Sequence, residues 1–349
     1  MTFPPKQTPR RVLIVKPSAL GDVVTALPVL RGLRRTFGRD VHVAWLVNTA
    51  CAGLIAHDSD LDECVPFERH RLGKAWWNPA AAAALGRLLR RLRRRRYDWV
   101  LDLQGLLRSA LLSWATRAPV RAGFADAREG ARWFYTDKAH VEADRHTVDR
   151  NVLLARELGI DARGQDMTLQ VARSAAEFAA AFAEAHRIDR RFVVCVPPTR
   201  WATKLYPVRH WRTVVGRLAR SVPVVIAGAP GDRALCAAVA DGAPPGVVNA
   251  AGKTDVAQMV GLIAASAGVV CCDSAAKFIA PAVGVDVVTL VGPTRVERTG
   301  PYLRGRPIVA DVPCQGCLRK ACRHITCMES IDPEVVIAAA EDMLTRDNP

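Results

Sequence analysis

The sequence lacks the long apolar segments of a membrane span or a secretory signal. No uncharged apolar run in its 349 residues reaches the roughly 18 that a spanning helix needs. Its first ten residues, MTFPPKQTPR, contain no apolar block like that of a signal peptide. The 24 glycines and 22 prolines are too few for a low-complexity chain. We therefore expect a fully folded, cytoplasmic protein.

Two familiar nucleotide-binding motifs are also missing. The first loop, residues 17–22, contains a single glycine, Gly21, and so cannot supply a G-x-G-x-x-G phosphate loop. This disfavours a dinucleotide-dependent dehydrogenase. The chain has no G-x-x-x-x-G-K-[ST] segment either, so the sequence gives no support for a P-loop ATPase.

Cysteine is present, but not in the pattern of a secreted disulfide framework. Six of the ten cysteines are scattered, at positions 51, 64, 195, 236, 271 and 272, and we expect reduced thiols. The other four lie close together in the tail: Cys314, Cys317, Cys322 and Cys327. Four thiolates at this spacing could hold a structural zinc or iron ion, and a thiol cluster without metal is the alternative.

Positive charge is concentrated in the first half of the chain. Residues 1–165 contain 28 lysines and arginines against 17 aspartates and glutamates, which gives +11 of the formal net charge of +15. The densest part is an arginine run at 93–96, preceded by Arg87, Arg90 and Arg91. Such a run attracts anionic partners, although it can equally solvate one helix face. Few aromatic residues flank it, so we expect no nucleic-acid partner.

A regular alternation of short apolar runs and amphipathic segments predicts an α/β fold. Buried strands are expected at 11–16, 41–47, 98–103, 192–196, 223–227, 268–272 and 286–291. Helices are expected at 23–38, 80–96, 207–219, 231–241, 255–265, 275–283 and 333–345. Because the series occurs twice, we predict two doubly wound, Rossmann-like domains at 1–165 and 166–330, with a linker around 160–172. The final helix is expected to pack back on the first domain.

In such sheets ligands bind beyond the carboxyl ends of the strands, so the loops there should carry the site. Asp22 stands at a helix start, where it is either a general base or a carboxylate favoured by the helix dipole. Thr199, Thr203 and Lys204 follow a predicted strand and suit the oxygens of a diphosphate. Lys204 could equally be a solvated loop residue.

Two further loops have the same ambiguity. Asp273 and Ser274 follow the predicted strand at 268–272, where a helix begins. They either belong to a phosphate site at the helix start or simply cap the helix. Asp232, after the strand at 223–227, could accept hydrogen bonds from ribose hydroxyls.

Several longer segments together resemble the ADP-heptose:lipopolysaccharide heptosyltransferases of glycosyltransferase family 9. They are RVLIVKPSALGDVVTALPVLRGLR at 11–34, YDWVLDLQGLLRSALL at 97–112, HTVDRNVLLARELGI at 146–160, the loop at 199–211, LVGPTRVERTGPY at 290–302, and the tail with IDPEVV at 331–336. The resemblance covers nearly the whole chain. It implies a GT-B architecture of two facing Rossmann-like domains, with the lipid acceptor on the N-terminal domain and the nucleotide sugar on the C-terminal one.

The resemblance also implies roles for residues in these loops. Asp22 matches the family's catalytic base, and Lys204 matches a residue that binds the leaving diphosphate. Arg128 matches a position on the acceptor side. Donor-binding positions are expected at Ser18, Gly21, Thr199, Thr203, Asp232, Asp273 and Ser274. No cofactor is obligatory in this scheme.

One segment departs from the family pattern. The family's helix opening is Asp-Thr/Ser-Gly-x-x-His, but Ala275 replaces the glycine here and Phe278 replaces the histidine. We expect a Cβ at 275 to hinder close approach of a phosphate, and Phe278 cannot donate a hydrogen bond. Lys277 is our candidate for the missing donor and positive charge.

The implied reaction is inverting transfer of heptose from ADP-heptose to Kdo-lipid A. This acceptor is polyanionic and lies at the inner membrane surface, which gives the basic first domain a function. One alternative is a glycosyltransferase of the same fold with another donor, or with a protein or other glycan as acceptor. A more remote alternative is a non-enzymatic polyanion-binding protein. The sequence does not predict the oligomeric state.

Overall fold

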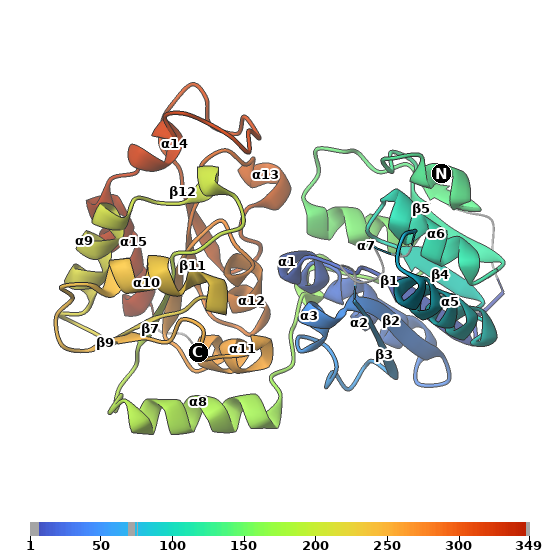
Figure 1. Ribbon diagram of the computed structural model, residues 1–349, viewed down its shortest axis with the longest axis horizontal. Coiled ribbons are helices and arrows are strands. Elements are labelled where there is room, and N and C mark those ends of the chain that lie inside the picture. The colour runs from blue at the N-terminus through green and yellow to red at the C-terminus, as the bar shows by residue number, and fades with distance from the viewer. Residues whose placement is uncertain (1–6, 69–73, 75, 347–349) are drawn as a thin grey trace. The chain divides into compact units, whose positions relative to one another are not determined.

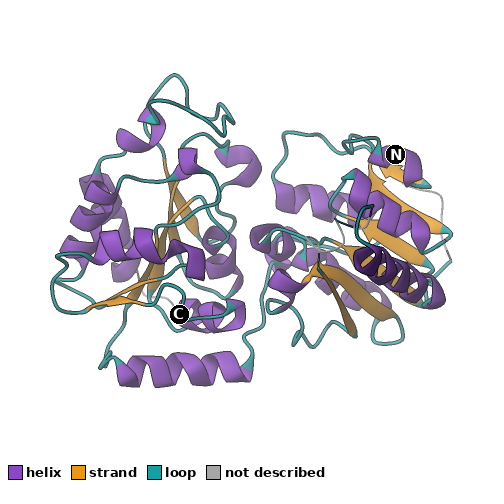
Figure 2. Cartoon of the chain, in the orientation of Figure 1, coloured by secondary structure: helices purple, strands orange, loops and turns teal. Residues whose placement is uncertain are grey.

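The computed structural model describes residues 7–68, 74 and 76–346. Residues 1–6, part of the N-terminal segment considered above as a possible signal peptide, lie outside this range. The chain divides into two compact units, Met1–Met167 and Thr168–Pro349. Each contains a six-stranded parallel sheet covered by helices (Figures 1 and 2). The predicted α/β class with two doubly wound sheets is therefore confirmed. Within the described ranges, no helix combines the length and hydropathy needed to cross a membrane.

The N-terminal sheet has the strand order β3-β2-β1-β4-β5-β6. Its strands are β1 Arg11–Val15, β2 His42–Asn48, β3 Glu63–Phe67, β4 Trp99–Asp102, β5 Val120–Phe124 and β6 Asp137–Ala139. Leu13 and Val15 of the central strand β1 belong to an apolar core that α5 leucines and Leu112 complete. Alternate residues of β1 are buried on the other face, as expected for a strand covered on both sides.

The helices of this unit are α1 Leu20–Val24, α2 Leu27–Phe37, α3 Thr49–Ala52, α5 Pro79–Arg94, α6 Leu107–Ala115 and α7 Thr147–Glu157. α5 contacts α6, and both lie over the same face of the sheet (Figure 1). α2 packs against α7. The single helix expected at 23–38 is in fact two helices, α1 and α2. Pro28 lies in the first turn of α2, where a proline breaks no intrahelical hydrogen bond, so a new helix begins there.

The C-terminal sheet has the order β12-β11-β10-β7-β8-β9. Its strands are β7 Val193–Val196, β8 Val224–Ile226, β9 Val247–Asn249, β10 Gly268–Cys272, β11 Val287–Leu290 and β12 Gly305–Ile308. Strands β7, β8, β10 and β11 confirm the four predicted from the sequence of this half. β9 and β12, which the sequence did not reveal, lie at the two edges of the sheet.

The helices of the C-terminal unit are α8 Arg173–Ala185, α9 Val208–Leu218, α10 Arg233–Ala240, α11 Val256–Ala264, α12 Ala276–Ala282, α13 Val296–Thr299, α14 Thr326–Glu329 and α15 Pro333–Thr345. The expectation that the last helix packs on the first domain requires correction. α15 packs against α9, β10, β11 and β12, and Val336, Ile337 and Met343 lie in the core of the C-terminal unit. Its apolar face is buried against this sheet, which fixes its position by hydrophobic contact.

Candidate active-site residues in the two units

Each sheet has one place where the chain reverses its direction of travel across the sheet. In the N-terminal unit it lies between β1 and β4, and in the C-terminal unit between β7 and β10. The loops that leave two such strands diverge and open a crevice at their carboxyl ends. The predicted site loops at 17–22, 197–204 and 273–278 directly follow three of these four strands.

Asp22 is the third residue of α1, and its side chain closes the first turn. Asp22 Oδ2 accepts a hydrogen bond from the backbone N–H of Ala19 at 2.7 Å. The helix-start role weighed for this residue is thus present, and the second carboxylate oxygen has no hydrogen-bond partner in the described part of the chain. In the same loop, the backbone N–H of Ser18 donates to Gln104 Oε1 at 3.4 Å. Gly21 is buried.

A buried lysine, Lys16, lies between β1 and this loop. Lys16 Nζ donates to the carbonyl oxygen of Leu103 at 2.5 Å, which ties the end of β1 to the end of β4. Burial lowers the pKa of Lys16, and the neighbouring carboxylates of Asp22 and Asp102 partly oppose this shift. The sequence analysis did not identify Lys16, because a lysine at a strand end reads as an ordinary surface residue.

Asp102 orders the loop that follows β4. Its carboxylate accepts hydrogen bonds from the Tyr135 hydroxyl at 2.7 Å and from the backbone N–H of Gln104 at 2.9 Å. Burial raises the pKa of Asp102, and these hydrogen bonds act against that rise. Arg128, the acceptor-side candidate, is exposed, and its backbone N–H donates to the carbonyl oxygen of Gly105 at 3.0 Å. Arg128 therefore lies at the same sheet edge as the loop bearing Ser18.

Asp273 is the centre of the polar cluster in the C-terminal unit. Lys204 Nζ lies 2.8 Å from Asp273 Oδ2, and Lys277 Nζ contacts Oδ1. Thr294 Oγ1 donates to Oδ2 at 2.5 Å, and Thr199 Oγ1 donates to the backbone carbonyl of Asp273 at 3.0 Å. Two ammonium groups share one carboxylate, so the cluster carries one excess positive charge.

Burial and charge act in opposite directions on these groups. Burial raises the pKa of Asp273, but the charges of Lys277 and Lys204 outweigh it and hold that pKa below its usual value. Burial also lowers the pKa of Lys277, while its ion pair with Asp273 opposes the change. The net effect favours the ionised carboxylate, because Asp273 faces two cations whereas each lysine faces one anion.

The residues that depart from the family pattern surround this cluster. Lys277 Nζ lies 4.8 Å from the ring centroid of Phe278, and both side chains are buried. Ala275 has the ordinary helical values φ −63° and ψ −28°, so its backbone does not require glycine. α12 begins without a side-chain cap, which means that Asp273 and Ser274 are not caps. The buried Ser274 hydroxyl has no hydrogen-bond partner in the described part of the chain.

The remaining donor candidates are placed on nearby loops. Thr203 is buried and its hydroxyl donates to the carbonyl oxygen of Arg319 at 2.9 Å. Asp232 Oδ2 accepts the backbone N–H of Ala229 at 2.8 Å, within its own turn. Trp201, which the sequence analysis missed, has Lys204 Nζ at 4.3 Å and Lys320 Nζ at 5.0 Å from its ring centroid.

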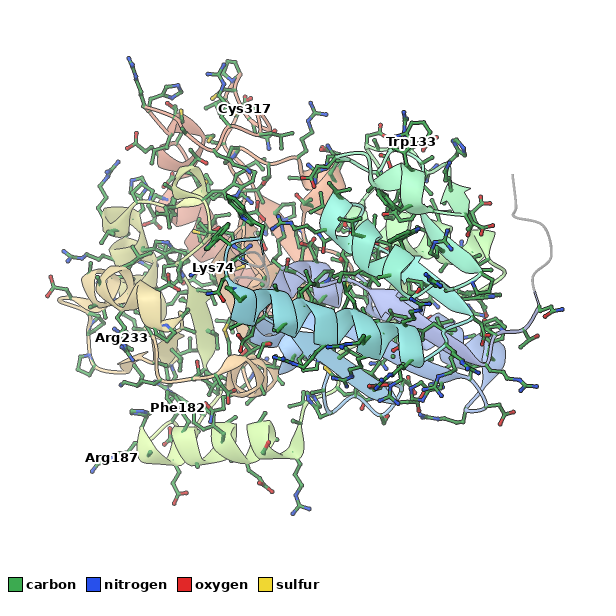
Figure 3. All side chains as sticks on the ribbon, turned by 45° about the vertical axis from the view of Figure 1, so that its right-hand side comes forward. Lys74, Trp133, Phe182, Arg187, Arg233 and Cys317 are labelled. Carbon is green, nitrogen blue, oxygen red and sulfur yellow. The ribbon has the colours of Figure 1, made fainter. Side chains whose placement is uncertain are left out.

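The four tail cysteines lie around one small cavity. The cavity has a volume of about 160 Å³, and its lining includes Cys314, Cys317, Cys322, His324 and Cys327. Cys317 is on the exposed loop between β12 and α14 (Figure 3). Within residues 7–68, 74 and 76–346, no three histidine, cysteine, aspartate or glutamate side chains are grouped to hold a metal ion. The structure thus gives no support to the predicted zinc or iron ion.

Comparisons with known proteins identify the family of this chain and proteins with the same fold. The model of glycosyltransferase family 9 (heptosyltransferase) matches residues 85–327. The lipopolysaccharide heptosyltransferase 1 of Pseudomonas aeruginosa is 29% identical over 324 residues, which are 90% of this chain and 88% of the relative.

Two solved structures share the fold across almost the whole chain. A family 9 glycosyltransferase from Veillonella parvula aligns with a TM-score of 0.80 at 19% identity, covering 96% of this chain and 97% of the other. The E. coli heptosyltransferase WaaC, solved with ADP-2-deoxy-2-fluoro heptose, aligns with a TM-score of 0.75 at 24% identity, covering 95% and 99%. These likenesses confirm the predicted GT-B fold. The chain belongs to glycosyltransferase family 9, the heptosyltransferases, and is a glycosyltransferase.

Proposed function

We propose that this protein transfers heptose from ADP-heptose to the Kdo-lipid A inner core of lipopolysaccharide, with inversion at the anomeric carbon. The similarity to a lipopolysaccharide heptosyltransferase 1 along nine-tenths of the chain supports the acceptor class. The likeness to a structure holding a fluorinated ADP-heptose supports the donor class. In this proposal the enzyme acts in the cytoplasm, at the inner membrane surface.

The observation that carries the proposal is the Asp273 cluster. Its excess positive charge lies at the carboxyl edge of the C-terminal sheet, where nucleotide ligands of doubly wound folds bind. Lys204 and Lys277 would meet the negative charge that develops on the departing ADP, and this stabilises the transition state more than the ground state. Ser274, at the start of the loop before α12, is proposed to contact the donor from its backbone.

The proposed step forms one bond and breaks one. The acceptor hydroxyl oxygen attacks the anomeric carbon of the heptose from the face opposite to ADP. The bond between that carbon and the diphosphate oxygen breaks, and its electron pair leaves with ADP. Asp22 takes the hydroxyl proton, for which its carboxylate must approach to about 2.6–3.2 Å in the reacting complex. Ser18, Gly21, Thr199, Thr203 and Asp232 complete the proposed donor contacts.

The N-terminal unit is proposed to bind the acceptor. Kdo carboxylates and lipid A phosphates are anionic, and the first 165 residues carry +11 of the formal charge. Arg128 is exposed beside the loops that follow β1 and β4, and we assign it to an acceptor carboxylate or phosphate.

The replacement of the family histidine by Phe278 favours a second candidate, a related glycosyltransferase with a changed donor. Phe278 is buried and supplies no hydrogen bond to a sugar. A protein or another glycan would be the acceptor in one version of this candidate. Thermal shifts with a panel of nucleotide sugars separate the two, because a ligand that binds only the folded state raises the melting temperature.

Replacing Asp22 with asparagine tests the proposal. The amide oxygen of asparagine can still accept the Ala19 N–H, so the first turn of α1 is retained while the base is lost. We expect heptose transfer to fall by at least 1,000-fold, within the scale of general-base catalysis, with ADP affinity nearly unchanged. Substantial residual transfer by Asp22→Asn would refute the role of Asp22. A wild-type protein that binds ADP but uses another nucleotide sugar would favour the second candidate.

A further inference from the structure

The face of the N-terminal unit formed by α5 and α6 has an apolar groove. The cavity has a volume of about 340 Å³. Its apolar lining comes mainly from Phe67, from α5 and from α6: Leu85, Leu89, Leu106, Leu111, Leu112 and Trp114. Pro17, Ser18 and Gln104 also line it, so the groove reaches the loop that carries Asp22. A groove of this composition favours a hydrocarbon occupant.

Large apolar side chains on α6, and others just before α5, are exposed. Trp114 is 57% exposed and Leu111 is 41% exposed, both on α6. Just before α5, Trp76 and Trp77 are 84% and 56% exposed. Exposed side chains of this size on one unit indicate an interaction surface, because leaving them in water is unfavourable.

A further exposed tryptophan extends the same face. Trp133, labelled in Figure 3, belongs to the 3-10 turn Ala131–Phe134, which contacts α6. The guanidinium of Arg132 lies 4.9 Å and Lys138 Nζ 5.8 Å from its ring centroid. Tryptophan beside basic groups is the combination enriched where a protein meets the boundary between lipid head groups and acyl chains.

The exposed side of α5 is a row of arginines with few counter-ions. Arg91 and Arg95 both bind Glu63 Oε1 at 2.8 Å. Arg87, Arg90 and Arg94 form no ion pair with any residue that the structure describes. All five line an open hollow of about 630 Å³. Arg108, on α6, is exposed and adds a positive charge to the lining of the apolar groove.

We propose that the α5–α6 face docks on an anionic lipid bilayer and that the groove between the helices accepts an acyl chain. The arginine row binds lipid phosphates, and the exposed tryptophans and Leu111 enter the interface. A chain held in the groove leaves its lipid head group beside the loop with Ser18 and Asp22. The inference deepens the proposed function, since it specifies how a lipid-linked acceptor reaches the N-terminal unit.

Vesicle flotation with the full chain tests the docking surface. The probes are vesicles of phosphatidylethanolamine and phosphatidylglycerol at 3:1, and vesicles of phosphatidylcholine alone. We expect binding to the anionic vesicles only, weakening as salt rises. The variant Arg87→Glu/Arg90→Glu/Arg94→Glu should bind about 100-fold more weakly or worse, since each arginine near such a surface contributes about a factor of five. The matched control, Arg187→Glu/Arg190→Glu/Arg191→Glu, changes three exposed arginines outside this surface and should bind like the wild type.

The groove needs its own measurement. Vesicles with brominated acyl chains should quench the tryptophan fluorescence of the wild type, and Trp114→Phe should lose part of that quenching while it still binds. Leu89→Arg/Leu112→Ser should reduce quenching further. Circular dichroism and an unchanged ADP thermal shift would establish that these variants remain folded. Quenching that is the same in wild type and Trp114→Phe would overturn the acyl-chain site.

Several outcomes would overturn the docking proposal. They are no flotation with anionic vesicles at 150 mM salt, equal losses in the two arginine triples, or tight binding of single-stranded RNA without vesicle binding. Failure of the proposed function is separately visible. If the protein floats with anionic vesicles as expected but does not transfer heptose from ADP-heptose, the proposal of a lipid-binding surface is supported and the proposed reaction is wrong.

Discussion

The carboxylate of Asp273 is buried against the ammonium group of Lys277, four residues later in the chain, and Lys204 Nζ approaches the same carboxylate at 2.8 Å. Lys277 is the second residue of α12, the helix that follows strand β10. Lys277, the candidate replacement for the family's histidine, is therefore already ion-paired with the carboxylate of Asp273. Under the proposed function, the stability and the ADP affinity of the C-terminal unit therefore depend on the same three side chains.

Replacing Lys277 with methionine should weaken both properties. Because Asp273 keeps only one of its two cations, we expect the free energy of unfolding to fall by about 3 kcal/mol, the lower end of measured losses for broken buried ion pairs. Loss of one positive charge should reduce ADP affinity about tenfold, or about 1.4 kcal/mol. Denaturant unfolding and calorimetry measure the two effects. Lys253→Met, at an exposed lysine, should change neither; ADP affinity unaltered in Lys277→Met would remove Lys277 from the donor site.

The same carboxylate predicts a dependence of stability on pH. The pKa of Asp273 is lowered in the folded state, so its ionised form stabilises the fold at every pH above the ordinary value of about 4. This contribution is lost as pH falls from about 4 through the lower folded pKa. The stability difference between wild type and Asp273→Asn should therefore shrink between pH 5 and about pH 2. Guanidinium unfolding at several pH values measures it, and a constant difference would contradict the ionised, paired state.

The cysteines should differ widely in their reaction with iodoacetamide. Backbone N–H groups of His324 and Ile325 lower the pKa of the Cys322 thiol, which increases its thiolate fraction near neutral pH. Burial raises the pKa of Cys271 and Cys272 to about 12. In a short alkylation pulse at pH 7.5, mass spectrometry of peptides should show modification at Cys322 first and at the two strand thiols only after unfolding. Equal labelling of Cys271 and Cys322 in the native protein would contradict this order.

Tyr135→Phe should destabilise the N-terminal unit through Asp102. It removes the 2.7 Å hydrogen bond to a buried carboxylate but keeps the ring, so we expect a loss of about 1.5–3 kcal/mol in unfolding free energy. Tyr97→Phe is the matched control, because the buried Tyr97 hydroxyl has no hydrogen-bond partner within the described ranges and its loss should be nearly neutral. Thermal and denaturant unfolding of both variants measure the difference. Equal effects would show that the hydroxyl–carboxylate bond contributes little.

Gly123→Ala provides a second perturbation of the same contact. A Cβ at Gly123 on β5 would collide with the Tyr135 ring. The ring must then move away from Asp102, so Gly123→Ala should destabilise the unit at least as much as Tyr135→Phe. Combining the two substitutions should cost less than the sum of the single losses, because both act on one interaction. Full additivity in denaturant unfolding would show that they act independently.

The strands that the sequence failed to reveal are mostly those at the sheet edges. β3 and β12 contain Pro66 and Pro307, and β6 and β9 have only three residues each. Edge strands are half-solvated and tolerate proline, so they lack the continuous apolar run by which the central strands were recognised. α6 was missed for a related reason, since Leu111 and Trp114 are exposed and obscure the helical period.

The sequence by itself determined the two α/β halves and the family, because the apolar period of each element and the residues of each motif are local properties. Only the tertiary structure decided what each polar side chain binds. It paired Asp273 with Lys277 of α12 and with Lys204 from a distant turn, brought Tyr135 to Asp102, and packed α15 in the C-terminal core. Such pairings depend on which strands lie side by side and on burial, where a charge must find a partner. Residues far apart in the chain meet for reasons that no local pattern contains.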